Sequence, residues 1–403
     1  MSTRPTILCI SSYFKGNPFI ERAKEEGCTV YLLTVEHLLG HPWVRDSIDE
    51  VFAVPTFADR ETLLNVVAYI MRSRPIDRVV ALDEFDVEVS GYLRDYFGWD
   101  GFGESSAGRF HDKLTMRQNA ERLGVRQPAF TSLFVDAHVQ SFLEASEGPW
   151  LLKPRGEAAA IGIRKLHTRE DVWNTLHELG DARRAHLLEC MVDGAMYHVD
   201  SLTAGGRVIF AEVNQYHRPL LEVAQGGGIY ATRTFDRDAP LRAALRAAND
   251  AVLEGFGLGR GASHTEFIVG ESDGLPYFIE TSARVGGAHV ADMVEAATGI
   301  NLWKEWASLE ALGGPNGSQG TYRVPSLRYD YAGTIISLAR QEHPDTSSFA
   351  DPEIVERLDK RNHIGFILRA AAPGRVAELL AAYRERIQSD FHASLPQSAR
   401  PVD

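Results

Sequence analysis

Cysteine, lysine and long apolar runs are all scarce in this chain of 403 residues, and each scarcity excludes a class of protein. Its three cysteines, Cys9, Cys28 and Cys190, are widely spaced and form no Cys-x-x-Cys pair. That spacing indicates neither a zinc site nor a disulfide framework, and it favours a cytoplasmic protein. No apolar run approaches the roughly 20 residues that span a bilayer, so no membrane partner is expected.

Positive charge is also in deficit, because the formal net charge is −13. A general nucleic-acid binder needs clustered Lys and Arg to neutralise phosphates, so no nucleic-acid partner is expected. A local basic site for a small anionic ligand remains compatible with this charge. The contents of 44% hydrophobic and 24% charged residues are those of a soluble globular protein.

Apolar strand patterns alternate with helical patterns in the first part of the chain. Strands are predicted at 6–10, 29–34 and 78–82, and helices at about 18–26 and 59–72. This order predicts a parallel sheet, so residues 1–110 are interpreted as a Rossmann-like α/β domain. No Gly-x-Gly-x-x-Gly follows the first strand, which makes dinucleotide binding there unexpected.

The character of the sequence changes near residue 110. A helix is predicted at 112–123, followed by short strands at 150–153, 161–166, 186–190, 197–203 and 208–213. An amphipathic helix at 241–256 precedes a hairpin and a helix at 290–298. A further small α/β unit is expected at 320–403, with a mobile polar tail from Ser394 to Asp403. The predicted fold class is therefore α/β, and in part α+β.

The hairpin at 264–284 offers the strongest chemical signal. Two apolar runs flank the turn Gly270–Gly274, and cross-strand partners whose numbers sum to about 546 would place Glu266 opposite Glu280. Opposed carboxylates on one sheet face repel each other unless a cation lies between them, and hard oxygen ligands suit Mg²⁺. The alternative is a solvated polar face on which Arg284 is a local counter-charge.

Other segments are suggestive only in combination. An apolar strand ends at Lys153-Pro154, and the small-residue loop 155–163 behind it can bring backbone N–H groups close to phosphates. A second strand, 187–190, enters the turn at Met191–Gly194, where backbone groups can contact an adenine ring. Taken alone, each segment is more typical of an ordinary strand connection or strand end.

Taken in order, these motifs resemble the ATP-grasp superfamily of carboxylate–amine ligases. The ordered set is Lys113, Lys153-Pro154, the small-residue loop, Glu189-x-x-Val192, Glu266, and Glu280 through Arg284 to Gly287. Only seven of the 42 basic residues are lysines, so two lysines at the expected positions add modest support. The resemblance implies a Rossmann-like domain at 1–110, an ATP-grasp domain at 111–319 with a lid subdomain at about 128–190, and a completing unit at 320–403.

The resemblance also implies a role for each motif residue. Lys113 and Lys153 would contact ATP phosphates, and Glu189 with the backbone of Cys190 to Val192 would hold adenine. Glu266 and Glu280 would bind Mg²⁺, which Mn²⁺ can replace. Arg284 would hold the reacting carboxylate and stabilise charge in transfer, and Gly287 would let the substrate approach the backbone.

Three positions depart from the pattern common in the superfamily. Met196 stands where many members have a glutamate for the ribose, and Ser282 stands where many have a metal-binding asparagine. Ala160 replaces the usual serine of the phosphate loop. These departures concern nucleotide orientation and metal affinity, whereas the lysines, glutamates and Arg284 are retained, so an active enzyme is expected.

Within the superfamily, the length and the Glu280–Gly287 block look most like the L-amino-acid ligases. The implied reaction joins an amino acid, or another small carboxylic acid, to an amine and releases ADP and phosphate. Candidate substrate contacts are His217, Arg218, Arg233, His264 and His289. A homodimer is implied by the family alone. Two alternatives stay open: a carboxylase acting through carboxyphosphate, and a catalytically silent nucleotide-binding regulator.

Overall fold

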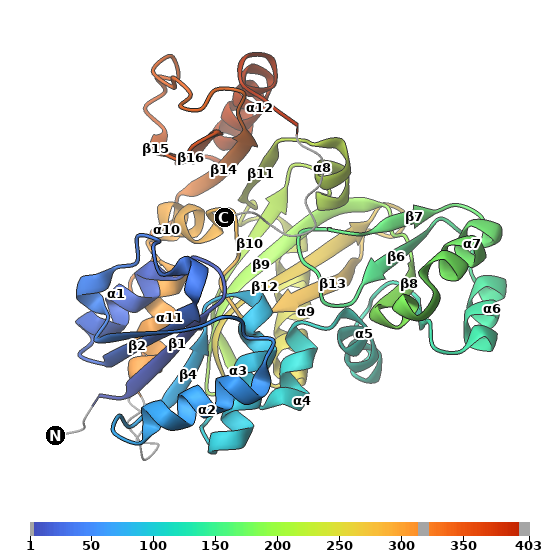
Figure 1. Cartoon of the computed structure of the whole chain (residues 1–403). Helices are drawn as coiled ribbons and strands as arrows, with labels where there is room; N and C mark the ends of the chain where they lie inside the picture. Colours follow the sequence, from blue (N-terminus) through green and yellow to red (C-terminus); the bar gives the residue numbers. More distant parts are fainter. Residues whose placement is uncertain (1–3, 313–321, 395–403) are drawn as a thin grey trace.

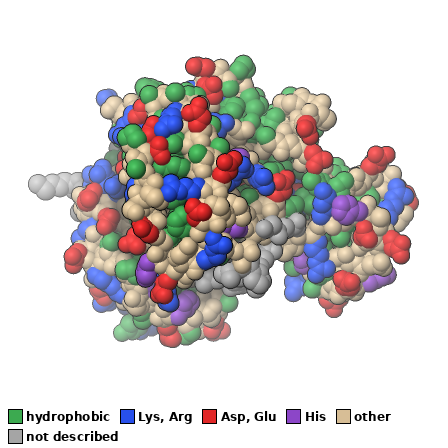
Figure 2. Space-filling view, turned by 90° about the horizontal axis from the view of Figure 1, so that it is seen from above, with side chains coloured by type: hydrophobic (Ala, Val, Ile, Leu, Met, Phe, Trp, Pro, Cys, Tyr) green, Lys and Arg blue, Asp and Glu red, His purple; other side chains and the backbone are tan. Residues whose placement is uncertain are grey.

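The computed structural model describes residues 4–312 and 322–394 and arranges them as three β-sheets with helices around them (Figure 1). An N-terminal four-stranded sheet lies on one side of a central eight-stranded sheet. A second four-stranded sheet, here called the lid sheet, lies on the other side. In the view from above, the lobe that holds the lid sheet projects away from the main body (Figure 2).

The N-terminal sheet is parallel, in the order β3-β2-β1-β4. Its strands are β1 (Thr6–Ser11), β2 (Thr29–Val35), β3 (Glu50–Val54) and β4 (Arg78–Ala81), and its helices are α1 (Asn17–Glu25), α2 (Arg60–Met71), α3 (Val87–Phe97) and α4 (Glu104–Ala107). The continuous apolar runs of β1 and β2 are buried because helices cover the sheet. A 3-10 turn follows β4 and places buried Asp83, Glu84 and Asp86 beyond the carboxyl end of that strand.

The central sheet runs in the order β13-β12-β9-β10-β11-β14-β16-β15 and is antiparallel throughout. Its strands are β9 (Gly194–Ala204), β10 (Arg207–Tyr216), β11 (Tyr230–Thr234), β12 (Arg260–Gly270), β13 (Pro276–Ser282), β14 (Tyr331–Leu338), β15 (Ile354–Arg357) and β16 (His363–Ala370). The strands that follow residue 320 therefore extend this sheet and form no sheet of their own.

The lid sheet has the order β5-β8-β6-β7 and is also antiparallel. It consists of β5 (Phe130–Ser132), β6 (Trp150–Pro154), β7 (Arg164–Leu166) and β8 (His186–Cys190), with α6 (Asp136–Ala145) and α7 (Arg169–Leu179) beside it. Both helices contribute to a small core of their own, in which Val139, Leu143, Val172 and Leu176 pack with Trp150. A separate core of this kind lets the lobe hold its shape independently of the main body.

The remaining helices of the described residues lie around these sheets. They are α5 (Lys113–Arg122), α8 (Leu220–Gly226), α9 (Pro240–Phe256), α10 (Val290–Thr298), α11 (Leu302–Ala311) and α12 (Pro373–Asp390). Helix α11 packs against both α1 and β12, and α12 packs against β14 and β16. Within residues 4–312 and 322–394, no helix has the length and apolar character needed to cross a bilayer.

The predicted α/β fold class is confirmed, and most predicted elements are present within one or two residues. Strand β7 is shorter than expected, because the strand predicted from residue 161 begins at Arg164. Helix α8 ends at Gly226, and its C-cap Gly227 lies in the left-handed region that glycine tolerates. The proposed boundary at 319/320 and the tail beyond Ser394 lie outside the described residues, and the domain boundaries stay a prediction.

Candidate active site

A cleft lies between the lid sheet and the central sheet and encloses about 920 Å³, including the open space at its mouth. One wall comes from β6 and the loop that follows it, and the other comes from β9, β12 and β13. Its charged lining residues are Lys113, Lys153, Glu157, Asp193, Glu222, Glu266 and Glu280. Apolar side chains such as Leu151, Ile163, Met196 and Ile268 line the rest. The cleft thus combines an apolar portion with converging charges, as ligand sites usually do.

The predicted register of the hairpin is confirmed, with Glu266 opposite Glu280 and His264 opposite Ser282. A register shift between Glu266 and Phe267 makes this possible, since Phe267 pairs with Phe278 and Ile279 becomes the extra residue of a bulge. Without the bulge Glu266 would face Ile279, and Glu280 would lie on the other face of the sheet. The bulge therefore brings both carboxylates into the cleft, together with Ile279.

Both lysines line the cleft, and each is paired with a carboxylate. Lys113 begins α5, whose N-cap Asp112 accepts the backbone N–H of Leu114 at 2.9 Å. Its Nζ lies 3.0 Å from Glu280 Oε2 and donates to the backbone carbonyl of Glu157 at 2.5 Å. Burial alone would lower the pKa of this amine, but Glu280 raises the pKa above its usual value. Lys113 therefore stays a cation inside the cleft.

Lys153 belongs to a buried group of three charges that joins the lid sheet to α5. Its ammonium pairs with Glu189 Oε1, and Arg117 Nε donates to Glu189 Oε2 at 3.0 Å. Both ends of the Glu189 carboxylate are thus occupied, and Glu189 is not among the residues that line the cleft. Burial would raise the pKa of Glu189, but Arg117 and Lys153 lower it, so the carboxylate is ionised.

The segment predicted to hold adenine follows β8. Cys190 and Met191 donate their backbone N–H groups to the carbonyls of Ala129 and Pro149, at 2.8 and 3.0 Å. Val192 and Met191 line the cleft, whereas Cys190 does not. Opposite them on the central sheet, Met196 pairs with Ile268 and both face the cleft, so the position that is often a glutamate is apolar here.

The small-residue loop after β6 also lines the cleft through Ala160, Ile161 and Ile163. Ala159 and Ala160 both adopt positive φ angles, 55° and 57°, which are strained for residues with a Cβ. The turn that they form keeps the loop close to Lys113, whose N–H donates to the carbonyl of Arg155 at 2.9 Å. The loop is therefore tied to the start of α5.

Arg284 lies beside the N-terminal sheet. Its guanidinium pairs with Glu84, which comes from the turn after β4, and its Nη1 donates to the carbonyl of Val285 at 2.8 Å. The Nε–H group is buried and has no hydrogen-bond partner among the described residues. A Cβ placed on Gly287, three residues further on, would meet nothing within 4 Å. Arg284 thus has a free donor near an open stretch of backbone.

The other predicted substrate contacts are scattered. His217 and Arg233 line a second cavity of about 620 Å³ between the end of β10 and α12, where His217 contacts Arg384. Arg218 is exposed, and His289 pairs with Asp292 at 2.8 Å at the start of α10. Of the five, only His264 lies next to a candidate metal ligand, with its Nε2 3.4 Å from Glu266 Oε1.

Sequence reasoning missed three residues that contact predicted site residues without lining the cleft themselves. Glu84 lies 200 positions before Arg284, yet acidic residues directly after a buried parallel strand are a usable signal. Tyr216 donates its hydroxyl to Glu266 Oε1 at 2.8 Å, and Asp200 contacts His264 at 2.7 Å. Polar residues alternating within apolar strands, as in His198-Val199-Asp200, could have indicated them.

The donor set fits a hard cation. Glu266 and Glu280 supply carboxylate oxygens from opposite strands, and the buried Ser282 hydroxyl on the same face has no partner among the described residues. Oxygen ligands of this kind suit Mg²⁺ or Mn²⁺. The buried Nε–H of Arg284 fits an anionic group in the same way.

Comparisons with known proteins support this geometry. No protein-family model matches the chain. The L-arginine-specific L-amino acid ligase of Bacillus subtilis is 23% identical over 320 residues, which cover 76% of this chain and 77% of that protein. The L-amino acid ligase of Bacillus licheniformis has a similar structure, with a TM-score of 0.76 at 19% identity over 98% of this chain and 100% of that chain.

A carboxylase has a similar structure as well. The biotin carboxylase domain of Hydrogenobacter thermophilus 2-oxoglutarate carboxylase, solved as a dimer with MgADP, ADP and bicarbonate, has a TM-score of 0.68 at 15% identity. It covers 98% of this chain and 92% of its own. These likenesses confirm the ATP-grasp fold that the motifs predicted.

Proposed function

We propose that this chain, which has the fold of the ATP-grasp ligases, joins a small carboxylic acid to an amine at the expense of ATP. The observation that supports this most directly is the convergence of Glu266 and Glu280 with Lys113 and Lys153 in one cleft. Two carboxylates for a metal and two cations for phosphates are what transfer of a phosphoryl group requires. The reaction releases ADP and phosphate and forms an amide.

The chemistry follows from the poor reactivity of a carboxylate. A carboxylate oxygen attacks the γ-phosphorus of ATP, the bond to the β-phosphate oxygen breaks, and an acyl phosphate forms. The amine nitrogen then attacks the acyl carbon, phosphate leaves, and the nitrogen loses a proton. Both steps accumulate negative charge on oxygens, which fixed cations stabilise. Acyl phosphates hydrolyse readily, so the lid lobe is assigned the task of excluding water.

We assign the charged residues as follows. Lys113 and Lys153 bind the phosphates, and Glu266 and Glu280 hold Mg²⁺ together with Ser282. The metal, when bound, neutralises the phosphate charge that develops during transfer. Glu189 acts on Lys153, because its carboxylate lies behind that lysine and is shared with Arg117.

The apolar portion of the cleft is assigned to adenine. Val192 and Met191 lie on the lid side, and Met196 and Ile268 lie on the sheet side, so a flat ring would be held between two apolar walls. Burying the ring in this way is favourable because its apolar faces leave water. Of the backbone contacts predicted for Cys190 to Val192, those of Met191 and Val192 stay part of this proposal, because Cys190 does not line the cleft.

An α-amino acid is the carboxylate that the Arg284–Glu84 pair supports best. An amino acid carries a carboxylate and an ammonium group. Its carboxylate can take the place of Glu84 beside Arg284, and its ammonium group can take the place of Arg284 beside Glu84. A simple carboxylic acid would occupy Arg284 and leave the buried Glu84 without its cation, which is costly. Glu84 is 7% exposed, so water would compensate little.

The two alternatives have less support. The carboxylase resembles this chain in structure at 15% identity, whereas the relative identified by sequence is an amino acid ligase. A catalytically silent regulator would not need four charged side chains that converge in one cleft. A homodimer and a cytoplasmic location stay predictions.

Phosphate release tests the function. The enzyme is incubated with Mg²⁺ and ATP against amino acids singly and in pairs, against the matching acids that lack the α-amino group, and against bicarbonate without amine. A ligase gives phosphate with at least one pair and a product mass equal to the two substrates minus water. Because the Arg284–Glu84 ion pair favours an α-amino acid, we expect the matching deaminated acids to be poor substrates. Release with bicarbonate alone would establish the carboxylase, and ATP binding without release across the matrix would favour the regulator.

A further inference from the structure

We propose that Asp200 is a positioning residue that orients the metal-binding carboxylate of Glu266 through His264. This inference rests on the proposed function, because it assigns Glu266 to the metal. It concerns a chain of hydrogen bonds on one face of the central sheet, where β9, β10 and β12 lie next to one another. Asp200 and His198 have no exposed surface, and neither lines the cleft.

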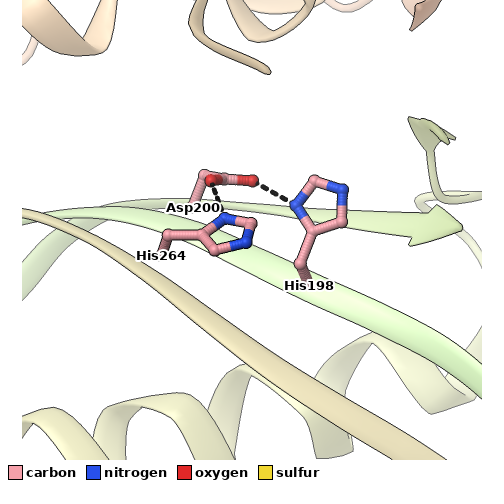
Figure 3. Close-up of side chains that lie close together, drawn as sticks. All are labelled: His198, Asp200 and His264. Atoms are coloured by element: carbon pink, nitrogen blue, oxygen red, sulfur yellow. Dashed lines mark hydrogen bonds and ion pairs between the residues drawn. The ribbon is translucent and has the colours of Figure 1, made fainter. Parts of the chain in front are cut away.

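Asp200 is held firmly at its end of the chain. Its Oδ1 lies 2.7 Å from His264 Nδ1, and its Oδ2 lies 2.6 Å from His198 Nδ1 (Figure 3). Asn214 donates its side-chain amide to the same Oδ2 at 2.8 Å, and His198 Nε2 lies 2.7 Å from Thr232 Oγ1. Both oxygens of Asp200 thus have fixed partners, and the carboxylate has one orientation.

The other end of the chain reaches the metal ligand. His264 Nε2 lies 3.4 Å from Glu266 Oε1, and the Tyr216 hydroxyl donates to that oxygen at 2.8 Å. The same hydroxyl lies 3.3 Å from His264 Nε2, so the three groups form a triangle. Both contacts use Oε1, and we assign Oε2 to the metal. Hydrogen bonds from neighbouring side chains, such as a carboxylate–imidazole pair, fix the orientation of a metal-binding side chain.

A second metal site or a purely structural role would fit these contacts less well. The ligand atoms of His198, Asp200 and His264 lie within 4.8 Å of one another and could hold a metal themselves. Both imidazole Nδ1 atoms, however, already meet Asp200, and Asn214 fills one of its oxygens as well. If the role were structural alone, apolar residues would stabilise the fold better, because buried charged groups cost free energy even when they are paired.

The glycine pair after Arg284 supplies an independent observation. A Cβ placed on Gly286 would lie 2.8 Å from His264 Nδ1 and 3.0 Å from Asp200 Oδ1. A contact under 3.0 Å requires something to shift, so any larger residue would disturb the Asp200–His264 bond. The loop that follows Arg284 therefore packs closely against the Asp200–His264 hydrogen bond. Because this loop begins at Arg284, the packing links the hydrogen bond to the reaction centre.

Metal binding in an Asp200→Asn variant tests the proposal. Asparagine has one acceptor oxygen for two imidazole donors, so His264 loses its fixed partner while the volume stays the same. Electron paramagnetic resonance of Mn²⁺ in the presence of ADP reports metal affinity without turnover. We expect the Mn²⁺ dissociation constant to rise about 10- to 100-fold, with metal-free ADP affinity within about twofold of the wild type. Gly286→Ala should shift Mn²⁺ affinity in the same direction without altering a charged group.

Glu212→Gln is the matched control, because Glu212 is a buried carboxylate that pairs across the strands with Asp200 and contacts Arg237 and Arg242. It should leave Mn²⁺ affinity unchanged. Unchanged affinity in both Asp200→Asn and Gly286→Ala would overturn the proposal, as would an equal loss in Glu212→Gln. If Asp200→Asn does not fold, Gly286→Ala decides alone. Failure of the proposed function would appear separately, as wild-type enzyme that binds Mn²⁺ and ADP but releases no phosphate.

Discussion

Two buried carboxylates, Glu189 in the lid sheet and Asp200 in the central sheet, each lie between two basic side chains, but they act on opposite walls of the cleft. Glu189 joins Arg117 to Lys153, and the series ends in a cation that lines the cleft. Asp200 joins His198 to His264, and the series ends in the carboxylate of Glu266. One arrangement presents a positive group and the other a negative group.

The chemical difference between the basic partners explains the division. Burial would raise the pKa of both carboxyls, and in each case the basic neighbours lower it instead. Lys153 ends in a single ammonium group that must serve Glu189 and the cleft together. An imidazole has one nitrogen on each side, so His264 can contact Asp200 and Glu266 at once. Although burial opposes its charge, Asp200 raises the pKa of His264 to about 10, so both nitrogens can donate.

Removing the carboxylate of the lid series should have the largest effect. Glu189→Gln leaves Arg117, which has no exposed surface, without an anionic partner. Losing one partner of a buried ion pair costs about 3–5 kcal/mol in the free energy of unfolding. Urea denaturation followed by circular dichroism measures this loss.

Glu212→Gln is the control for that measurement. Its two arginines are 15% and 17% exposed, so water can replace part of the lost interaction and the loss should be smaller. An equal loss in the two variants would show that burial of the arginines does not distinguish the lid series.

Replacing the cation Lys153 should distinguish the functions of the two cleft walls, one in nucleotide binding and the other in metal binding. Under the proposed role of Lys153, Lys153→Met removes a charged donor to phosphate, so we expect ATP affinity to fall about 100-fold, or about 3 kcal/mol. Mn²⁺ affinity measured with a nucleotide already bound should hold, in contrast to Asp200→Asn. Lys165→Met, which changes an exposed lysine of the same lid sheet, should alter neither quantity. A parallel fall in Mn²⁺ affinity would mean that the two walls act as one unit.

The sequence predicts the parts of the site that are local. The pairing of Glu266 with Glu280 follows from two strands and a short turn, and Lys113 follows from a capped helix start. The register was predicted without the bulge that produces it. No residue in that hairpin marks Ile279 as the extra one, because an apolar residue suits either face of a sheet.

The rest depends on tertiary contacts between distant segments. Glu84 reaches Arg284 only after the N-terminal sheet packs against the central sheet, and no spacing along the chain indicates that meeting. The side chain of Glu189 was predicted to face adenine, yet the buried cations on either side hold it behind Lys153. His217 lies two positions before Pro219, which lines the cleft, yet His217 and Arg233 line the second cavity beside α12, and no spacing along the chain indicates that placement.

Asp86 differs from Glu189 and Asp200, because it is a buried carboxylate that is not hydrogen-bonded to two basic side chains. It is 1% exposed and accepts the backbone N–H of Ser12 at 2.7 Å. Burial, with a smaller contribution from Asp83, raises its pKa from 3.8 to about 7. Between these two values the folded state keeps a proton that the unfolded chain has released, so stability falls as pH rises through this window.

We therefore expect the wild type to lose about 2.6 kcal/mol of unfolding free energy to Asp86 between pH 5 and pH 8. Asp86→Asn cannot ionise and should flatten the pH dependence by that amount. Asp77→Asn is the control, because Asp77 also accepts one backbone N–H, that of Thr6 at 2.8 Å, but is only half-buried. Urea denaturation at both pH values decides the matter. If the unfolding free energy of Asp86→Asn depends on pH as strongly as that of the wild type, Ser12 alone can stabilise the ionised carboxylate of Asp86. Two basic neighbours are then not what keeps Glu189 and Asp200 charged.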